Sequence, residues 1–147
     1  SPMKVTIIRG LPGSGKTTFA LKKVEVTGAV LIESDQFRTR DGGYVFNGAE
    51  TNAINNATMK MARIYAQFGA DIIFTGVFAK CDTISRILKT LKAYKPSGET
   101  LHAEIIRVVG DHPNRHRVPQ RVIDEFEAGY EPWSGETFVF TDNEGEV

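Results

Sequence analysis

The segment Gly10-Leu-Pro-Gly-Ser-Gly-Lys16-Thr17 has the residue types and spacing of a loop that binds phosphate. It matches the pattern G-x-x-x-x-G-K-[ST], follows a short β-rich run and opens a helical segment. Glycines let successive backbone N–H groups turn toward one anion, and the amino end of the helix adds its dipole. We therefore predict a binding site for a nucleoside triphosphate, made by Pro12, Gly13, Ser14, Gly15, Lys16, Thr17 and Thr18.

Two side chains of this loop have distinct predicted roles. Lys16 is expected to reach the β- and γ-phosphates as a catalytic point charge, and Thr17 to offer its hydroxyl to Mg²⁺. The third predicted strand ends at Thr75-Gly76 without an acidic residue, which argues against a plain ATPase. The ion would then rest on Thr17, with Asp35 as a second candidate ligand.

The segment Glu33-Ser-Asp35-Gln-Phe-Arg38 closes the second predicted strand. In a parallel sheet that end lies beside the phosphate loop. There Asp35 can take the proton of an acceptor hydroxyl, and Arg38 can hold a phosphate of the acceptor with its fork of donors. A second interpretation is that Asp35 caps a helical turn containing Arg38, a role that does not exclude catalysis.

Strands and helices are expected to alternate along the chain. This pattern favours an α/β domain of three layers with a parallel, five-stranded sheet. We expect one domain over residues 3–147, with residues 1–2 as a remnant of expression and 111–119 as a lid loop. The predicted strands are 4–9, 29–33, 71–75, 101–109 and 137–141, and the predicted helices lie at 15–26, 47–68, 84–94 and 119–128.

Charge is unevenly distributed along the 147 residues, although the net charge is zero. Residues 1–121 hold all 18 Lys and Arg but only 10 acids, which leaves that part at +8. Either the acidic tail is simply solvated, or the body meets a polyanion. One cysteine excludes an intrachain disulfide, and no apolar run approaches the ~20 residues of a membrane span. We expect no membrane partner and a cytoplasmic location, in the host cell if phage-encoded; the oligomeric state stays open.

The phosphate loop followed by D-x-x-R resembles the small P-loop kinases grouped around polynucleotide 5′-kinase, with zeta-toxin kinases as distant relatives and phage-type DNA kinases included. The resemblance covers about Met3 to Trp133, including "IIFTGVFAKCDTISRILKTL" and "NRHRVPQRVIDEFEAGYEP". It implies an adenylate-kinase-like P-loop NTPase fold. It also implies Asp35 as general base, Arg38 as the grip on the acceptor phosphate, and Arg115 or Arg117 as a lid arginine that meets ATP.

These observations predict a Mg²⁺-dependent kinase that uses ATP or another NTP. The acceptor would be a hydroxyl on DNA or RNA, above all a polynucleotide 5′-hydroxyl. A second possible acceptor is a hydroxymethyl-pyrimidine base in DNA, such as 5-hydroxymethyluracil, turned out of the duplex. The chain could also be a kinase of a small metabolite or nucleotide sugar, or a nucleotide-binding module without kinase activity.

Weaker signals leave two interpretations open. A row of basic residues at every third position is either a solvated helix face or a track for nucleic acid: Arg86, Lys89, Lys92 and Lys95. Aromatic residues near predicted strand ends either belong to the core or stack a base: Phe37, Tyr44, Phe46 and Phe78. His112 and His116 are expected to be loop residues rather than zinc ligands, and Trp133 to pack the C-terminal segment down.

Overall fold

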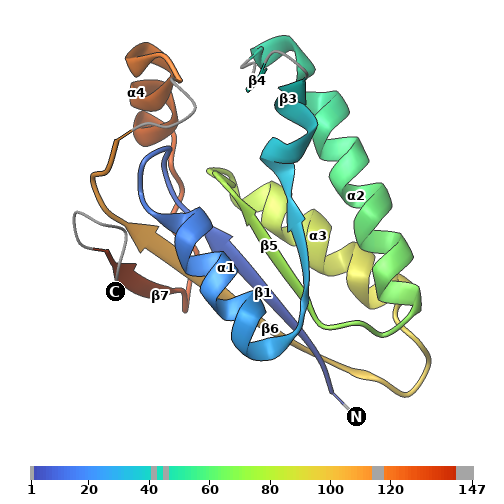
Figure 1. Cartoon of the computed structure of the whole chain (residues 1–147). Helices are drawn as coiled ribbons and strands as arrows, with labels where there is room; N and C mark the ends of the chain where they lie inside the picture. Colours follow the sequence, from blue (N-terminus) through green and yellow to red (C-terminus); the bar gives the residue numbers. More distant parts are fainter. Residues whose placement is uncertain (1, 41–42, 45–46, 114–117, 142–147) are drawn as a thin grey trace.

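A computed structural model describes residues 2–40, 43–44, 47–113 and 118–141 (Figure 1). Its centre is one five-stranded sheet in the order β2-β5-β1-β6-β7, in which every neighbouring pair is parallel. The predicted α/β fold with five parallel strands is confirmed. The strands are β1 (Pro2–Arg9), β2 (Val30–Glu33), β5 (Ile72–Gly76), β6 (Thr100–Val109) and β7 (Thr137–Phe140).

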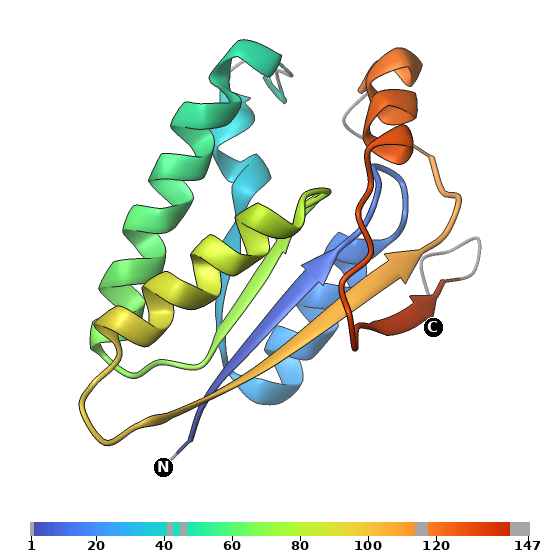
Figure 2. The same ribbon diagram turned by 180° about the vertical axis from the view of Figure 1, so that it is seen from behind.

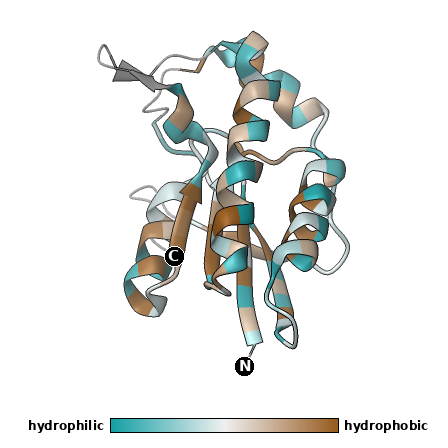
Figure 3. Ribbon diagram, turned by 90° about the vertical axis from the view of Figure 1, so that its right-hand side faces the viewer, coloured by the Kyte–Doolittle hydropathy of each residue, from teal (hydrophilic) through white to brown (hydrophobic). Residues whose placement is uncertain are grey.

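Helices cover both faces of the sheet, as Figures 1 and 2 show from opposite sides. The helices are α1 (Lys16–Thr27), α2 (Thr51–Gln67), α3 (Cys81–Tyr94) and α4 (Gln120–Ala128). Because side chains alternate along a strand, Ile7 of β1 packs with the α2 and α3 residues, whereas Ile8 packs with Ala20 of α1. The sheet is therefore buried on both faces, and Figure 3 shows its strands as largely hydrophobic beside helices of mixed character.

Local signals in the sequence fix several element boundaries. Gly28 adopts the left-handed conformation with φ of 71° and donates its N–H to the Val24 carbonyl at 2.8 Å, which ends α1. The Asn47 side chain accepts a hydrogen bond from the Ala49 N–H at 3.0 Å and caps the 3-10 helix η2 (Gly48–Glu50), which leads into α2. The predicted end of α1 is confirmed, whereas the helix start predicted at Asn47 was too early, because Asn47 caps η2 and α2 itself begins at Thr51.

Two segments differ from the sequence-based expectation. Strand β1 begins at Pro2, which pairs with Thr100, so the expected start at residue 4 was too late and Pro2 belongs to the sheet. A loop was expected over 38–46. The structure has the 3-10 helix η1 (Ser34–Arg38) up to the first of these residues, followed by a short antiparallel pair of strands, β3 (Thr39–Arg40) and β4 (Gly43–Tyr44). Such short pairs carry too little periodicity to be read from sequence.

After α4 the chain returns along the sheet and enters β7. Trp133 in this returning segment packs, partly buried, against the core cluster beneath α2 and α3, which confirms its predicted role. Hydrogen bonds also fasten the segment, because the Glu131 N–H donates to the Ala79 carbonyl at 2.8 Å. Among the described residues, no helix has the length and apolar character needed to cross a membrane.

Candidate functional site

The phosphate loop joins β1 to α1 at the carboxyl edge of the sheet. Figure 1 shows it directly below α4. Gly13 and Gly15 have φ of 83° and 91°, a region that residues with a Cβ rarely adopt. The Ser14 N–H donates to the Leu11 carbonyl at 3.0 Å, so the loop curls back on itself. The predicted strand–loop–helix context of the motif is confirmed.

Lys16 lies buried inside this curl. Its Nζ donates to the Leu11 carbonyl at 3.2 Å, and the residue is 7% exposed. Burial lowers the pKa of Lys16, while the charges of Asp35 and Glu33 act in the opposite direction. A triphosphate in the loop would add further negative charge and stabilise the ammonium. Because its charge acts on the Lys16 ammonium group, Asp35 lies within electrostatic reach of Lys16.

Two hydroxyls at the loop are buried without a hydrogen-bond partner among the described residues. They belong to Ser14, inside the loop, and to Thr75, near the end of β5. Thr75 pairs with Ile8 in the sheet, so it lies one strand away from the loop. Buried hydroxyls are normally satisfied, and an oxygen-rich ligand such as a phosphate would provide the missing partners.

The outer wall of the loop comes from distant segments that sequence reasoning missed. The His112 N–H donates to the Gly13 carbonyl at 2.8 Å, and the Thr141 hydroxyl donates to the Ser14 carbonyl at 2.7 Å. The His112 Nε2 and Thr141 Oγ1 atoms are 2.6 Å apart. A Cβ at Gly110 would lie 2.6 Å from the Ser14 carbonyl oxygen and would collide with Thr141, so only glycine fits this approach. The expectation that His112 is a loop residue therefore understated its role.

Asp35 and Arg38 share the 3-10 turn η1, as their spacing predicted. The Asp35 Oδ1 and Arg38 Nε atoms are 4.0 Å apart, and the Asp35 side chain is 33% exposed. Arg38 is buried and reaches the start of α2, where it donates to the Asn47 carbonyl at 3.0 Å and to the Thr51 hydroxyl at 3.3 Å. In this structure the arginine thus braces the turn against α2.

The turn and the end of β5 lie in close contact. A Cβ at Gly76 would lie 2.5 Å from the Ser34 hydroxyl oxygen and 3.0 Å from the Phe78 ring. The absence of a side chain at Gly76 thus lets the Asp35 turn approach the segment 77–79. Phe78 has φ of 42°, a strained conformation for a residue with a bulky side chain.

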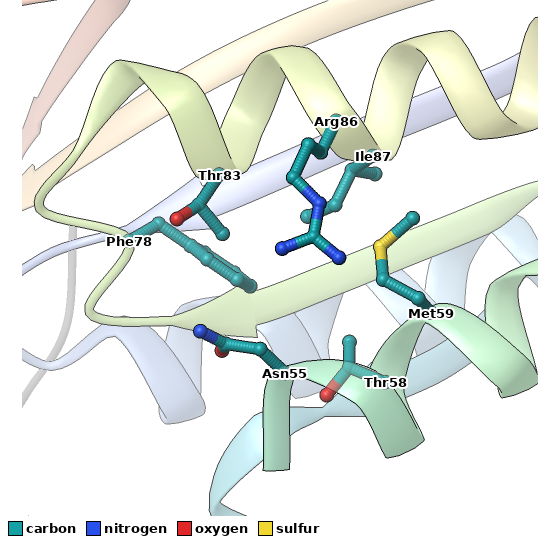
Figure 4. Close-up of a pocket in the computed structure, with 7 residues that line it drawn as sticks. All are labelled: Asn55, Thr58, Met59, Phe78, Thr83, Arg86 and Ile87. Atoms are coloured by element: carbon teal, nitrogen blue, oxygen red, sulfur yellow. The ribbon is translucent and has the colours of Figure 1, made fainter. Parts of the chain in front are cut away.

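A pocket opens next to Phe78, between α2 and α3 (Figure 4). Asn55 and Met59 contribute from α2, and Arg86 and Ile87 from α3. Its empty volume is about 240 Å³, part of which is open to solvent. In Figure 4 the Arg86 side chain extends from α3 toward α2, across the pocket.

A buried cluster around Arg9 holds the segment after β5, which carries Phe78. Arg9 is fully buried and donates to the Phe78 carbonyl at 2.8 Å and to the Glu136 carboxylate at 3.0 Å. Its guanidinium lies 4.4 Å from the centre of the Tyr130 ring, and that of Arg107 lies 4.2 Å away. The Tyr130 hydroxyl donates to the Val77 carbonyl at 2.8 Å. Burial raises the pKa of Tyr130 to about 12, although both arginines oppose that shift.

The structure brings together some predicted site residues and leaves others outside its description. The charge of Asp35 acts on the Lys16 ammonium group. Thr17 is exposed at the first turn of α1. The lid residues Arg115 and Arg117, together with His116 and Phe46, lie outside the described residues. Within the described ranges, no group of three or more His, Cys, Asp or Glu side chains could hold a metal ion.

The sequence is similar to that of uncharacterized protein PM0531 of Pasteurella multocida (strain Pm70). The two are 29% identical over 133 residues, which cover 81% of this chain and 72% of that protein. The similarity therefore extends over most of both chains, and by itself it points to no particular reaction.

Several solved structures, two of them kinases by title, share the fold at low sequence identity. An unliganded sugar kinase from Janibacter sp. HTCC2649 superposes with a TM-score of 0.63 and 19% identity, covering 96% of this chain and 86% of that one. The APS kinase CysC of Mycobacterium tuberculosis, in complex with AMPPNP and APS, superposes with a TM-score of 0.60 and 18% identity. The superposition covers 97% of this chain and 91% of that one. A chain of the Pnkp1/Rnl/Hen1 RNA repair complex superposes with a TM-score of 0.54 and 17% identity. The superposition covers 84% of this chain but only 36% of that one.

These similarities establish the P-loop kinase fold, as the sequence predicted, and the model of one protein family also matches the chain. The family is described as an AAA domain, and its match covers residues 5–133, from β1 to the segment after α4. The match includes the phosphate loop, the Asp35 turn and both walls of the pocket. Because it spans most of the chain, the protein belongs to this AAA domain family.

Proposed function

We propose that this protein transfers the γ-phosphate of ATP to a hydroxyl group in a Mg²⁺-dependent reaction. The observation that carries the proposal is that the phosphate loop with Lys16 follows β1 and the Asp35 turn follows β2 at the same edge of one parallel sheet, where the charge of Asp35 acts on Lys16. One residue belongs to the phosphate loop and the other to the turn after β2, so donor and acceptor chemistry meet at one edge of the sheet. A simple nucleotide-binding module would not need the carboxylate there.

The residues around the loop fit a nucleotide and its metal ion. Ser14 and Thr75 each present a buried hydroxyl without a partner among the described residues, and Lys16 is held inside the loop. Thr17 would hold Mg²⁺ together with phosphate oxygens. Bound Mg²⁺ neutralises negative charge on the transferring phosphate. Arg115 or Arg117 would close over ATP from the lid.

In the proposed reaction Asp35 acts as general base. The acceptor oxygen forms a bond to the γ-phosphorus atom, and the bond from that atom to the bridging oxygen of ADP breaks. The acceptor proton passes to the Asp35 carboxylate, and Lys16 stabilises charge on the phosphate oxygens. Little covalent work is left to the protein, because positioning and charge dominate phosphoryl transfer.

The favoured acceptor is the 5′-hydroxyl of a polynucleotide. Support comes from the charge of +8 on residues 1–121 and from the fold shared with a chain of an RNA repair complex. A second candidate is a small metabolite, because the sugar kinase and APS kinase structures resemble this chain over more of their own length. A 5-hydroxymethyluracil base in DNA is the third acceptor to be tested.

A transfer assay with labelled ATP and Mg²⁺ tests these acceptors directly. The panel contains an oligonucleotide with a 5′-hydroxyl, the same oligonucleotide with a 5′-phosphate, DNA with 5-hydroxymethyluracil, and a set of sugars and nucleotides. We expect label on the first and none on the second. Label on sugars alone would replace the polynucleotide by a metabolite. ADP release without label on any acceptor would contradict the kinase proposal.

Arg38→Ala probes how the acceptor is held. Arg38 is proposed to contact the acceptor phosphate, so KM should rise most for an acceptor with a phosphate next to its hydroxyl, while ATP affinity stays unchanged. The variant also loosens the start of α2, since it removes the bonds to Asn47 and Thr51. An acceptor without a phosphate controls for that loosening. An effect confined to ATP binding would place Arg38 on the donor side.

A further inference from the structure

Two residues that follow the strands β6 and β7 contact the phosphate loop from outside. The last residues of these parallel strands, Val109 and Phe140, pair with each other, so the segments after them leave the same edge of the sheet. The Thr141 N–H continues the ladder and donates to the Val109 carbonyl at 2.9 Å. In this arrangement the Thr141 Oγ1 and His112 Nε2 atoms lie 2.6 Å apart.

Glycines on both sides allow this pair to pack against the loop. A Cβ at Gly110 would collide with Thr141 and lie 2.9 Å from the His112 Nε2 atom. A Cβ at Gly15 would lie 3.0 Å from the Thr141 hydroxyl oxygen and 3.3 Å from the same nitrogen. The pair therefore lies directly against the residue that precedes Lys16.

The hydrogen bonds of the pair determine where its protons lie. The Thr141 hydroxyl has a single proton, and its oxygen lies 2.7 Å from the Ser14 carbonyl oxygen and 3.4 Å from that of Val109. A carbonyl oxygen can only accept, so the shorter bond, to Ser14, takes the hydroxyl proton. The contact between Thr141 and His112 must then be donated by the ring, which requires a proton on Nε2.

This chain of bonds acts on one peptide unit of the loop. The Ser14 carbonyl and the Gly15 N–H belong to the same unit, and the peptide bonds of the described residues are trans, so the two groups point in opposite directions. The bond from Thr141 to the carbonyl thus turns the Gly15 N–H away from the pair. Successive hydrogen bonds also polarise one another, which makes this N–H a stronger donor for an anion.

We propose that His112 and Thr141 are positioning residues of the donor site, which hold the Ser14–Gly15 peptide so that its N–H binds a phosphate of the nucleotide. The inference rests on the proposed function, because the phosphate loop is the donor site of that reaction. Neither side chain has a role toward the base of the nucleotide or toward the acceptor. Loss of the pair therefore weakens the binding of phosphate groups and leaves the acceptor KM unchanged.

Calorimetric titration tests the pair without catalysis. Wild type, Thr141→Val, Thr141→Ser and Thr27→Val are each titrated with AMPPNP and with inorganic tripolyphosphate, in the presence of Mg²⁺. Thr141→Val keeps the shape of the side chain but has no hydroxyl, so we expect both ligands to bind roughly tenfold more weakly. Thr141→Ser retains the hydroxyl and should restore the wild-type affinity. Thr27 donates to the Lys23 carbonyl at 2.7 Å at the far end of α1, so Thr27→Val is a matched loss that should leave binding unchanged.

Variants of His112 test whether the bonds form a chain. His112→Gln keeps an N–H donor near the position of Nε2, whereas His112→Leu has none, so only the leucine variant should weaken AMPPNP binding. The double variant His112→Leu/Thr141→Val should bind no more weakly than Thr141→Val, because the two residues act in series, and additive losses would contradict the chain. Two-bond ¹H–¹⁵N spectra in alkaline solution, where histidine rings are neutral, should show the proton on Nε2. A proton on Nδ1 would overturn the assignment.

Two results of the titrations would contradict the positioning role. Wild-type affinity of Thr141→Val for both ligands is one, and weaker binding of AMPPNP with unchanged binding of tripolyphosphate is the other, because it would place Thr141 on the nucleoside. If Thr141→Val does not fold, the comparison of His112→Leu with His112→Gln decides the same question. These outcomes are separate from the transfer assay: weaker phosphate binding by Thr141→Val supports the pair even where no acceptor is labelled and the kinase proposal fails.

Discussion

The phosphate loop and the Asp35 turn lie at the same edge of the sheet, with the end of β5 between them, yet they are held in different ways. Inside the loop the contacts are local, since Ser14 and Lys16 both bond to the Leu11 carbonyl. The turn depends on distant segments, because Arg38 reaches Asn47 and Thr51 and the backbone rests against Gly76. The curl of the proposed donor site is thus built by a short stretch of backbone, which His112 and Thr141 brace from outside, whereas the proposed acceptor side needs several elements to assemble.

This difference has a functional meaning in the proposed reaction. A backbone cradle recognises phosphate in any nucleotide, so it can stay the same while acceptors change. In the proposed reaction the Asp35 turn and the start of α2 hold the acceptor, and their side chains can vary without disturbing the loop. Substitutions on the donor side and on the acceptor side should therefore fail differently.

Lys16→Ala should have the largest effect. It removes charge from the oxygens that become more negative in the transition state, and losing one such group typically costs 10²–10³-fold or more. We expect transfer to fall below detection in an assay with labelled ATP. Because Lys16 is buried and its pKa is lowered by burial, its removal should not reduce the melting temperature. Turnover within about tenfold of wild type would contradict the assignment of the phosphate loop.

Asp35→Asn comes next and acts on the acceptor side. The variant keeps its shape and hydrogen bonding but cannot take a proton, so kcat should fall by roughly 10²–10⁴-fold with ATP affinity little changed. Glu33→Gln is the matched control, because Glu33 also lies in the charge environment of Lys16. Equal losses in both variants would point to general electrostatics rather than to a base.

The sequence predicts the parts of this site that are built locally and misses those that depend on distant segments. The loop, its lysine and the pairing of Asp35 with Arg38 are each written within a few residues, so their pattern can be recognised. The support around them is not local, since Arg9 bonds to Glu136 and Thr141 to Ser14 across 127 residues in both cases. Such contacts depend on strand order and register, which no short pattern specifies.

Arg9 illustrates the missing information. In the sequence it is the last residue of a short β-rich run, which gives no sign that its side chain is fully buried. It is buried because α4 and the returning segment bring Tyr130 and Glu136 over the sheet. The strained backbone at Phe78 is equally unreadable from sequence, since it is maintained by hydrogen bonds from Arg9 and Tyr130.

Arg9→Met separates stability from donor binding. It leaves the buried Glu136 carboxylate without its charged partner, which typically costs about 3–5 kcal/mol of the free energy of unfolding. Urea denaturation measures this loss, and the double variant Arg9→Met/Glu136→Gln should recover part of it. In protein that remains folded, acceptor KM should rise because Phe78 loses a bond, whereas ATP affinity should hold. Equal weakening of donor and acceptor would contradict the proposed independence of the loop.

Tyr130→Phe is the smallest change and the finest test. The ring stays close to the two arginines, and only the hydrogen bond to the Val77 carbonyl is lost, so acceptor KM should rise by a few-fold at most while ATP affinity is unchanged.

The Tyr130 phenol should also make the stability of the protein depend on pH. Its pKa is raised to about 12 in the folded state, so the unfolded state loses this proton first as the pH rises above its ordinary value of 10. The contribution of Tyr130 to stability is therefore complete below about pH 10 and disappears between about pH 10 and 12, at a cost of roughly 2–3 kcal/mol. Unfolding in urea at pH 8 and pH 11 should show a steeper alkaline loss for wild type than for Tyr130→Phe, and parallel losses would mean that this phenol titrates as it does in water.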